Sequence, residues 1–455
     1  MTKKFSLQIT MIILIALSAV SNAQTISIHL SNHTASNLYL HSLSGEKMTM
    51  LDSSSLDVNG NIIYDASSRN LCTGIYRWVI SGNKWLDFIN DGKDVSLSTN
   101  TKNVLDSLRV VESGSNKLFY SFLKLDKAYK TKTELLQLIL ARYPKDDSYY
   151  SETKKRLNEL QSEYLQFVNI KAQTDPASFV AKYIRSSQLP VIDSEIPIEM
   201  QLDHLKAHAL DNVNFNDASL INSDLFTNKT IEYLTYFRNP QLPKELLEKE
   251  FMKAVDSLLN KAKEHQLVYQ HITEYLIDGF KKFGFDQVLD YIVENYVIKD
   301  DLCLDVKTEG LIKRRIEQAK NFKIGAVVPN IVLPNLDGRE IDLKKIPKEK
   351  VLIVFYASWC PHCKDLLPKL NELKKSQTGN KLEVLAVSLD NKKEDWASFV
   401  KDNCSNLVNV SDLKGWEGKA ANDYFIYATP TMFLIDKTQK ILSKPMTFED
   451  VRKTL

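Results

Sequence analysis

Residues 351–363 read Val-Leu-Ile-Val-Phe-Tyr-Ala-Ser-Trp-Cys-Pro-His-Cys, and this stretch decides the fold. Its first seven residues form a short, continuous apolar run, which is typical of a buried strand. A helical pattern follows from Lys364 to about Lys375, so Cys360 and Cys363 are expected on the first helical turn. Unpaired backbone N–H groups and the helix dipole favour negative charge there, which makes a thiol easier to ionise. The stretch therefore predicts dithiol–disulfide exchange.

The bulk composition is that of a globular protein with more than one domain. The chain has 455 residues, of which 44% are hydrophobic and 25% are charged, and this length predicts two or three domains. The formal net charge is +2, and Lys3 and Lys4 at the N-terminus supply that excess. The balanced remainder gives no electrostatic reason to expect nucleic acid or a polybasic membrane contact.

Residues 1–23 are predicted to be a secretory signal peptide. Lys3 and Lys4 form the positive end, an apolar stretch begins at Met11, and Ser21-Asn22-Ala23 is a small-x-small cleavage site before Gln24. An uncleaved membrane anchor is the alternative, although the apolar run is short and broken for a span. No later stretch is long and apolar enough to cross a bilayer. We therefore expect an exported, periplasmic protein that could associate with the envelope.

The cysteine count does not describe a disulfide-stapled scaffold. The chain has five cysteines, and Cys360 and Cys363 form the one close pair. The other three, Cys72, Cys303 and Cys404, are scattered, and we expect them to be buried or bystander thiols. In an oxidising compartment, the close pair is better explained as a working redox centre than as a structural clip.

Three regions follow the predicted signal peptide. Residues 24–112 are β-rich, with period-two runs such as 25–30 and 75–80, and predict a small antiparallel sandwich. The aromatic residues Tyr76, Trp78, Trp85 and Phe88 are expected in its core, with a glycan-binding platform as the alternative. Residues 113–321 contain long 3.6-period patterns and predict roughly eight to ten helices. Apolar stripes at Leu157, Leu160, Tyr164 and Phe167, and at Leu247, Phe251, Ala254, Leu258 and Ala262, are expected to pack between helices.

Residues 322–455 show a mixed α/β pattern. Asp337-Gly338 lies between two short apolar runs and predicts a hairpin. A strand over 351–357, a helix over 361–375 and a strand over 382–389 form a βαβ unit. A helix around 394–402 follows, and strands over 432–436 and 440–443 with a short terminal helix complete the region. The pattern predicts a central sheet with helices on both faces.

This C-terminal region resembles the thioredoxin fold, and within it the TlpA-like family of exported thiol–disulfide oxidoreductases. The resemblance covers about residues 323–455 and rests on 355–363, Pro368, Asp337-Gly338, 428–431 and 433–436. The combination of Trp-Cys-x-x-Cys with a Thr-Pro just before a strand is specific to this resemblance. The order of the three regions is similar to the multidomain type found in Bacteroidota, in which the first 320 residues would position the redox domain or select its partner.

The chain departs from the family pattern at two carboxylate positions. Thioredoxin carries a buried Asp six residues before its first active cysteine, and that position is Val354 in this chain. Many TlpA-like proteins carry a Glu three residues after the second cysteine, and that position is Leu366. Such carboxylates help to move protons to and from the second thiol. Asp365 or Asp390 could substitute, so the proton carrier stays open.

The roles of the cysteines and the residues between them follow from their places on the helix. Cys360 is the expected attacking thiol, and Cys363, one turn further in, is the resolving thiol. Pro361 suits the first helical turn because no N–H is needed there. The imidazole of His362 is expected to stabilise the Cys360 thiolate and to lower its pKa.

Two further elements are expected to shape the docking surface. Trp359 is expected to pack beside the cysteines. The resemblance implies that Thr429-Pro430 is a cis peptide beside Cys360, where backbone groups would pair with an extended substrate segment.

The direction of exchange stays open at this point. TlpA-like proteins are mostly reductants, whereas Cys-Pro-His-Cys occurs in strongly oxidising periplasmic thiol oxidases. The chain could also be a disulfide isomerase or a non-catalytic binding or scaffold protein. The expected partners are protein thiols and disulfides and a membrane-borne electron donor.

Metal and haem chemistry are disfavoured, and we expect no cofactor. A structural zinc site needs four ligands, and the chain has no second close cysteine pair. Haem attachment would need His in place of Lys364, and a peroxidatic site would usually carry proline before the first cysteine. His204 and His208 are four residues apart, but no Glu follows His204, so a solvated helix face is expected.

Overall fold

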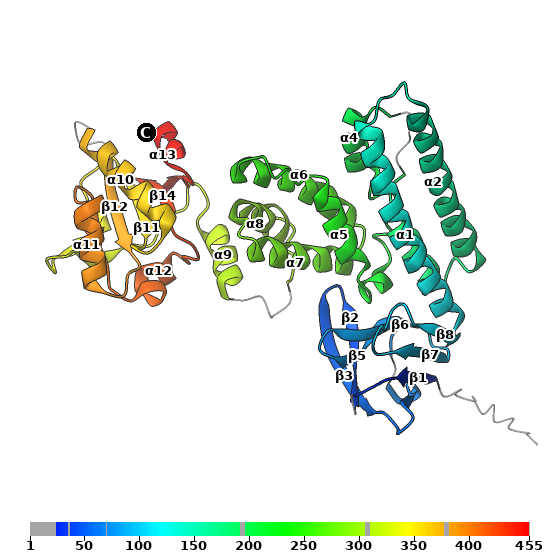
Figure 1. Cartoon of the computed structure of the whole chain (residues 1–455). Coiled ribbons are helices and arrows are strands. Elements are labelled where there is room, and N and C mark those ends of the chain that lie inside the picture. Colours follow the sequence, from blue (N-terminus) through cyan, green and yellow to red (C-terminus); the bar gives the residue numbers. More distant parts are fainter. Residues whose placement is uncertain are drawn as a thin grey trace, which may run out of the picture. The chain divides into compact units, whose positions relative to one another are not determined.

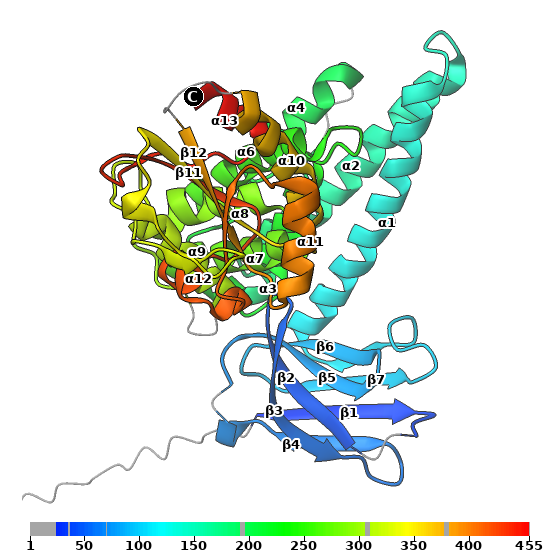
Figure 2. The same cartoon turned by 90° about the vertical axis from the view of Figure 1, so that its left-hand side faces the viewer.

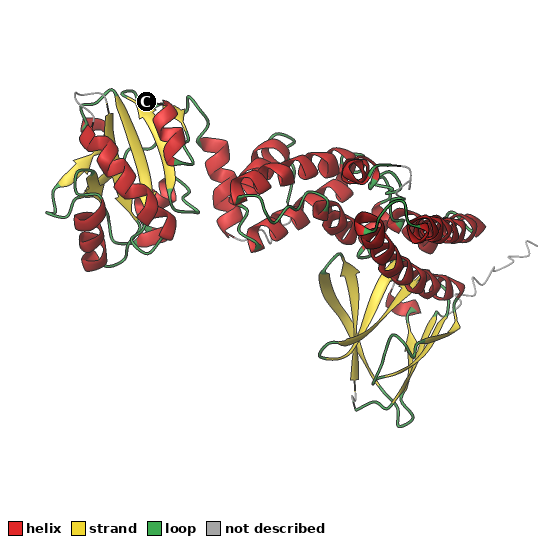
Figure 3. Cartoon of the chain, turned by 45° about the horizontal axis from the view of Figure 1, so that its top comes forward, coloured by secondary structure: helices red, strands yellow, loops and turns green. Residues whose placement is uncertain are grey.

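The computed structural model of the chain describes residues 24–34, 37–69, 71–191, 196–304, 310–376 and 382–454 (Figure 1). The predicted signal peptide, residues 1–23, lies outside these ranges. The chain divides into two compact units: residues 1–238 with 260–272, and residues 239–259 with 273–455. The N-terminal region is built of β-sheets, the middle region is helical, and the C-terminal region is a thioredoxin-like domain (Figure 3). The boundaries predicted at residues 112 and 321 stay predictions, because the division into units falls within the helical region.

Two four-stranded sheets form the N-terminal region (Figure 2). One sheet has the strand order β4-β1-β7-β8 and the other has the order β3-β2-β5-β6. Inward-facing residues of both sheets, such as Ile28, Leu40 and Trp78, form one apolar core. The strands are β1 (Thr25–Ser31), β2 (Asn37–Ser44), β3 (Lys47–Ser55), β4 (Asn61–Asp65), β5 (Gly74–Ser81), β6 (Lys84–Asn90), β7 (Val95–Asn100) and β8 (Arg109–Glu112).

The structure corrects two expectations for this sandwich. Strands β1 and β7 pair in parallel, with Ile28 opposite Leu97, so the sandwich is not purely antiparallel. Trp85 is 39% exposed and lies outside the core, whereas the other three aromatic residues singled out above are buried. Its ring lies 4.5 Å from the guanidinium carbon of Arg77 on the outer face. Outward-facing aromatic rings are stabilised by such cation–π contacts as well as by burial.

One of the two apolar stripes that the sequence predicts lies on α2 of the first unit. Leu157, Leu160 and Tyr164 of α2 are buried, and Phe167 is half-buried. Polar caps mark the starts of α1, α2 and α3, where the side chains of Ser113, Asp147 and Ser178 accept hydrogen bonds from backbone N–H groups. The helices are α1 (Gly114–Arg142), α2 (Ser148–Thr174), α3 (Phe179–Ser187), α4 (Ile198–His208) and α5 (Leu225–Thr235).

Four further helices precede the thioredoxin-like domain. Helices α6 (Lys244–Ala262) and α7 (Gln266–Lys282) contribute residues to both units. Helix α8 (Asp286–Ile292) continues into a π-helical segment (Val293–Ile298), and α9 (Gly310–Asn321) follows. The described part of the middle region thus holds nine α-helices, α1 to α9, within the predicted range of eight to ten. None of the described helices has the length and apolar character that crossing a membrane requires.

A five-stranded sheet with the order β13-β12-β11-β14-β15 forms the thioredoxin-like domain. Strands β11, β12 and β13 are parallel, and β14 and β15 are antiparallel to their neighbours. The predicted hairpin is present as β9 and β10, whereas the short elements β13 and α12 were not predicted. The elements are β9 (Val332–Pro334), β10 (Glu340–Asp342), β11 (Lys350–Tyr356), α10 (Pro361–Ser376), β12 (Leu382–Ser388), α11 (Lys393–Asn403), β13 (Val408–Val410), α12 (Lys419–Asp423), β14 (Thr431–Asp436), β15 (Ile441–Ser443) and α13 (Phe448–Thr454).

The central strand β11 explains the apolar run and positions the cysteines. It lies between β12 and β14, and residues 351–357 are buried because both faces of the sheet are covered. Phe355 near its end is opposite Thr431 at the start of β14. The segments that follow β11 and precede β14 therefore meet at the same edge of the sheet, and these segments contain Cys360 and Thr429-Pro430.

Candidate active site

A tight turn after β11 brings Cys360 to the start of α10. The Cys360 backbone N–H donates to the carbonyl oxygen of Ala357 at 3.1 Å. The carbonyl oxygen of Cys360 then accepts from the N–H of Lys364 at 3.1 Å, which is the first bond of the helix. Pro361 is the first residue of α10, as expected, and Cys363 is the third. Both sulfurs therefore belong to the first helical turn.

The two thiols differ in accessibility. Both are free thiols in this structure; Cys360 is 5% exposed and Cys363 is fully buried. The Sγ of Cys360 donates to the carbonyl oxygen of Thr429 at 3.2 Å. The structure thus brings Cys360, Cys363 and Thr429 together, as the sequence predicts.

The pKa values of the two thiols are shifted in opposite directions. Burial raises the pKa of Cys360, but hydrogen bonds from the Thr429 side chain, from Cys363 and from the backbone of His362 outweigh it, so the pKa lies below its usual value. Burial raises the pKa of Cys363 well above its usual value, and the neighbouring Cys360 raises it further. Cys360 is therefore the thiol that ionises first, which suits an attacking nucleophile.

The peptide bond between Thr429 and Pro430 is cis, as predicted. The segment is fixed at its far end, where β14 begins at Thr431 and the Thr431 hydroxyl donates to the carbonyl oxygen of Ala428 at 2.7 Å. The carbonyl oxygen of Thr429 faces Cys360. This arrangement places backbone groups of an irregular segment directly beside Cys360.

Two tryptophan side chains lie on the surface beside the cysteines. Trp359 is 56% exposed, and its ring centroid lies 6.5 Å from that of Trp416. The residue before Trp416 is Gly415, whose φ of +56° suits glycine, and a Cβ there would lie 2.6 Å from the Oδ1 of Asn391. Trp416 is distant from the cysteines in the sequence and belongs to no recognisable motif, so the sequence alone does not indicate it. His362 is exposed on the first turn of α10.

The two carboxylates named as substitute proton carriers occupy different environments. Asp365 is exposed and pairs with Lys369, one turn further along α10, at 2.7 Å. Asp390 is 2% exposed and accepts hydrogen bonds from the hydroxyls of Ser358 and Ser388, each at 2.7 Å, and from the N–H of Ser358 at 3.1 Å. Asp390 thus holds the turn that leads to Cys360. Val354 and Leu366 are both buried apolar residues of the core.

Comparison with known proteins identifies the family. The AhpC/TSA family matches residues 324–444. The thiol–disulfide oxidoreductase ResA of Bacillus cereus is 31% identical over 125 residues, which are 28% of this chain and 70% of ResA. The chain belongs to the thiol–disulfide oxidoreductases of the thioredoxin superfamily. The sporulation thiol–disulfide oxidoreductase A of Bacillus subtilis is 26% identical over 134 residues, which are 28% of this chain and 79% of that protein.

Solved structures from Bacteroides are also similar to this oxidoreductase. One is the C-terminal domain of a putative thiol–disulfide oxidoreductase from Bacteroides thetaiotaomicron, which is 28% identical with a TM-score of 0.28. The match covers 29% of this chain and 93% of the Bacteroides thetaiotaomicron chain. A thioredoxin-like protein from Bacteroides caccae is 21% identical, with a TM-score of 0.37, and covers 58% of this chain and 96% of that chain.

The remaining features singled out in the sequence lie outside the oxidoreductase site. Cys72 and Cys303 are exposed and Cys404 is buried. His208 is exposed and its Nδ1 lies 2.8 Å from Asp211, in keeping with a solvated helix face. Across the described ranges, no group of three or more His, Cys, Asp or Glu side chains is placed to hold a metal ion.

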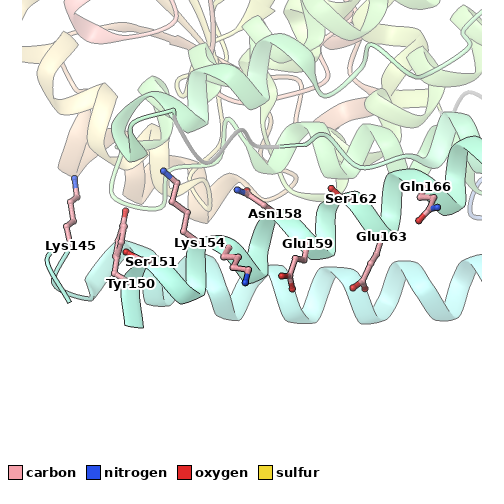
Figure 4. Close-up of a pocket in the computed structure, with 10 residues that line it drawn as sticks. Lys145, Tyr150, Ser151, Lys154, Asn158, Glu159, Ser162, Glu163 and Gln166 are labelled. Atoms are coloured by element: carbon pink, nitrogen blue, oxygen red, sulfur yellow. The ribbon is translucent and has the colours of Figure 1, made fainter. Parts of the chain in front are cut away.

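A surface pocket lies along α2 in the first unit (Figure 4). Lysines 145, 154 and 155 and the carboxylates of Glu159 and Glu163 line it, together with polar side chains of the same helix. Arg156 bridges Glu159 and Glu163 at 2.9 and 3.3 Å. A single helix surface with compensated charges is a solvated face, and it adds nothing to the redox site.

Proposed function

We propose that this oxidoreductase exchanges disulfides with protein substrates through Cys360 and Cys363, and that it acts as a reductant. The observation that carries the proposal is the Cys360 thiol at the start of α10, hydrogen-bonded to Thr429 beside the cis Pro430, with Cys363 buried behind it. Export follows from the predicted signal peptide, and the reducing direction follows from the resemblance to TlpA-like proteins.

The proposed exchange has two steps. The Cys360 thiolate attacks one sulfur of the substrate disulfide and forms a mixed disulfide, and the other substrate sulfur leaves as a thiolate that takes up a proton. Cys363 then loses its proton and attacks the sulfur of Cys360, which releases the second substrate thiol. Two electrons pass to the substrate, and Cys360 and Cys363 become a disulfide. An external dithiol donor, proposed to be membrane-borne, reduces that disulfide and completes the cycle.

The neighbouring residues would serve docking and tuning. An extended substrate segment would pair with the backbone at Thr429-Pro430, as in strand addition to a sheet edge. The exposed ring of Trp359 would cover the segment on one side. Pro361 leaves the helix start free of an unneeded N–H, and the exposed imidazole of His362 would favour the thiolate when it is protonated.

The acidity of Cys360 supports the opposite direction as a second candidate. A lowered thiol pKa stabilises the reduced pair, and a stabilised reduced pair is a better oxidant. A glutathione titration of the full chain measures the reduction potential of the pair. A value near about −270 mV supports the reductant, whereas a value near about −120 mV contradicts the proposed direction.

Insulin reduction tests whether the chain is an active thiol–disulfide exchanger. We expect the full chain to reduce insulin disulfides in the presence of dithiothreitol, and Cys360→Ser to lose that activity. Equal, negligible turnover by both proteins would favour a scaffold role instead. Rescue of a scrambled disulfide substrate without net reduction would indicate an isomerase.

Amino-terminal sequencing tests the proposed export. Expression of the full chain in a bacterial host should yield a mature protein that begins at Gln24, because the small-x-small site ends at Ala23. A protein that retains Met1 in the periplasmic or membrane fraction would contradict cleavage and favour the anchor.

A further inference from the structure

Helix α9 lies outside the region that matches the family and binds the segment that precedes the cis Pro430. The family match begins at residue 324, whereas α9 ends at Asn321. Three neighbouring side chains of α9, Arg314, Arg315 and Gln318, contact residues 416–427. All of these residues belong to the second unit.

Arg314 and Gln318 satisfy backbone groups that precede and follow α12. Arg314 Nη1 donates to the carbonyl oxygens of Trp416 and Ile426, each at 3.2 Å, and Nη2 donates to the Oδ1 of Asn422 at 2.6 Å. Gln318 Nε2 donates to the carbonyl oxygens of Tyr424 and Phe425 at 2.9 and 3.3 Å. Carbonyl groups at a helix end need such donors, because the helix offers them none. Two residues of α9 therefore hold groups at both ends of the path from Trp416 to Ile426.

Arg315 forms a compact ion cluster with α8 and Tyr427. Its Nη1 donates to Oδ1 of Asp290 at 2.6 Å and its Nη2 donates to Oδ1 of Asp286 at 2.8 Å. The Tyr427 hydroxyl donates to the same oxygen of Asp290 at 2.8 Å. The guanidinium carbon of Arg315 lies 4.1 Å from the centre of the Tyr427 ring. Arg315 is 5% exposed, whereas the side chain of Asp286 is 56% exposed, so the contacts with Asp290 and Tyr427 form the more buried and directionally demanding side of the cluster.

This cluster fixes one end of the segment that faces the nucleophile. Tyr427 is two residues before Thr429, whose carbonyl oxygen accepts a hydrogen bond from the Cys360 thiol. The other end is fixed by the pairing of β14 with β11 from Thr431 onward. The segment between these two anchors is too short to absorb a shift at Tyr427 without moving Thr429. The same helix holds the carbonyl of Trp416, whose ring lies beside that of Trp359.

We propose that Arg314, Arg315 and Asp290 are positioning residues of the redox site. Through Tyr427 and Trp416 they set the place of the docking segment relative to Cys360, so that α8 and α9 determine how well a substrate disulfide docks. The inference rests on the proposed exchange through Cys360, and it assigns to the helical region a direct part in that exchange.

Tyr427→Phe in the full chain is the primary test, because it keeps the ring over Arg315 and removes only the bond to Asp290. We expect KM for a short synthetic peptide with one internal disulfide to rise about threefold to tenfold. This change corresponds to part of the free energy that one hydrogen bond to a charged group contributes. We expect kcat to change less than KM, because the variant keeps both cysteines. Arg314→Gln, which releases the Trp416 and Ile426 carbonyls, should act in the same direction.

Measuring the alkylation of Cys360 as a function of pH separates a positioning role from a purely structural one. A purely structural role would leave the midpoint of alkylation unchanged. The peptide that carries Cys360 is quantified by mass spectrometry after iodoacetamide treatment, so the other cysteines do not interfere. We expect the midpoint of alkylation to shift to higher pH in Tyr427→Phe, because a displaced Thr429 stabilises the thiolate less well. Lys313→Ala, at an exposed position on the same helix, is the matched control and should leave KM and the midpoint unchanged.

The outcomes separate this inference from the proposed function. Unchanged KM and an unchanged midpoint in both Tyr427→Phe and Arg314→Gln, with an active wild-type chain, would overturn the positioning role and leave the exchange intact. An inactive wild-type chain would overturn the exchange itself. A double-mutant cycle of Tyr427→Phe with Asp290→Asn should give strongly non-additive KM values, and additive values would show that the two residues act independently.

Discussion

Replacing Asp390 by Asn tests what the buried carboxylate behind the Cys360 turn does. Its Oδ1 accepts from the hydroxyl and the N–H of Ser358, and its Oδ2 accepts from the hydroxyl of Ser388. An Asn side chain can keep the Oδ1 contacts, but it presents an NH₂ group to Ser388. The variant therefore loses one charge-assisted hydrogen bond and weakens the others, which costs about 2 kcal/mol of folding free energy.

The same substitution has a defined effect on the reaction. Both carboxylate oxygens of Asp390 accept hydrogen bonds from Ser358 and Ser388, and Ser358 is two residues before Cys360. We therefore expect Asp390→Asn to slow attack by Cys360 and resolution by Cys363 less than about tenfold, because the turn loosens but no proton acceptor is lost. A general base, by contrast, contributes about 10²–10⁴-fold.

Two assays measure these effects. Chemical denaturation followed by tryptophan fluorescence gives the change in stability, and rapid quenching with a peptide disulfide gives the rates of attack and resolution. Asp365→Asn is the matched control, since an exposed ion pair such as Asp365–Lys369 contributes about 0–1 kcal/mol. A loss of more than about 100-fold in resolution at neutral pH, recovered as the pH rises, would refute the holding role and identify Asp390 as the base.

Three further predictions concern the thiols and the surface beside them. Cys363→Ser should accumulate a mixed disulfide at Cys360 with a peptide substrate on a non-reducing gel, and its absence would contradict the assigned order of attack. Burial raises the pKa of Cys404 to about 12, so this thiol should cost the reduced chain about 1.4 kcal/mol of stability per pH unit between about pH 9 and 12, because the unfolded thiol ionises and the folded one does not. Cys404→Val should lessen the total slope in pH-dependent denaturation by that amount, while Cys72→Ser should not. Trp416→Ala should raise KM for peptide disulfides about threefold to tenfold with little change in kcat, and an unchanged KM would show that the ring takes no part in docking.

The parts of the fold that could be predicted are those with a strong local pattern. The apolar run 351–357 and the helical pattern after it are long enough to identify a buried strand and the helix that carries both cysteines. The helical stripes at Leu157 and Leu258 were likewise correctly assigned to buried positions. In the helices the period of the apolar residues indicates which face is covered, and in the strand the unbroken apolar run indicates that both faces are.

The elements that were missed depend on contacts that no local pattern records. Strand β13 has three residues and α12 has five, which is too short for a period to show. The parallel pairing of β1 with β7 joins residues about 70 positions apart. The exposure of Trp85 could have been anticipated. Trp85 and Phe88 are three positions apart, and residues at an odd offset face opposite sides of a regular strand.

The candidate site shows the same division between local and distant information. Cys360, Cys363, Trp359 and Thr429-Pro430 could be named because a specific motif and its resemblance mark them. Asp390 could be named only as one of two carboxylates, since its burial against Ser358 and Ser388 depends on the neighbouring strand β12. Arg315 carries no motif, and its role becomes visible only when α9 is seen against Tyr427.

The opposite pKa shifts of the two thiols depend on burial and on neighbours such as Thr429. Two sulfurs on the same helical turn share the same dipole, so the dipole alone cannot make one acidic and the other inert. The difference comes from burial and from the neighbouring Cys360, which raise the pKa of Cys363, whereas hydrogen bonds from Thr429, Cys363 and His362 lower the pKa of Cys360. Thr429 is held on one side by the sheet and on the other by Tyr427, whose partner Asp290 belongs to α8. Thr429, which is hydrogen-bonded to Cys360, is therefore held by the central sheet on one side and by α8 through Tyr427 on the other, and this is the arrangement that the proposed positioning role requires.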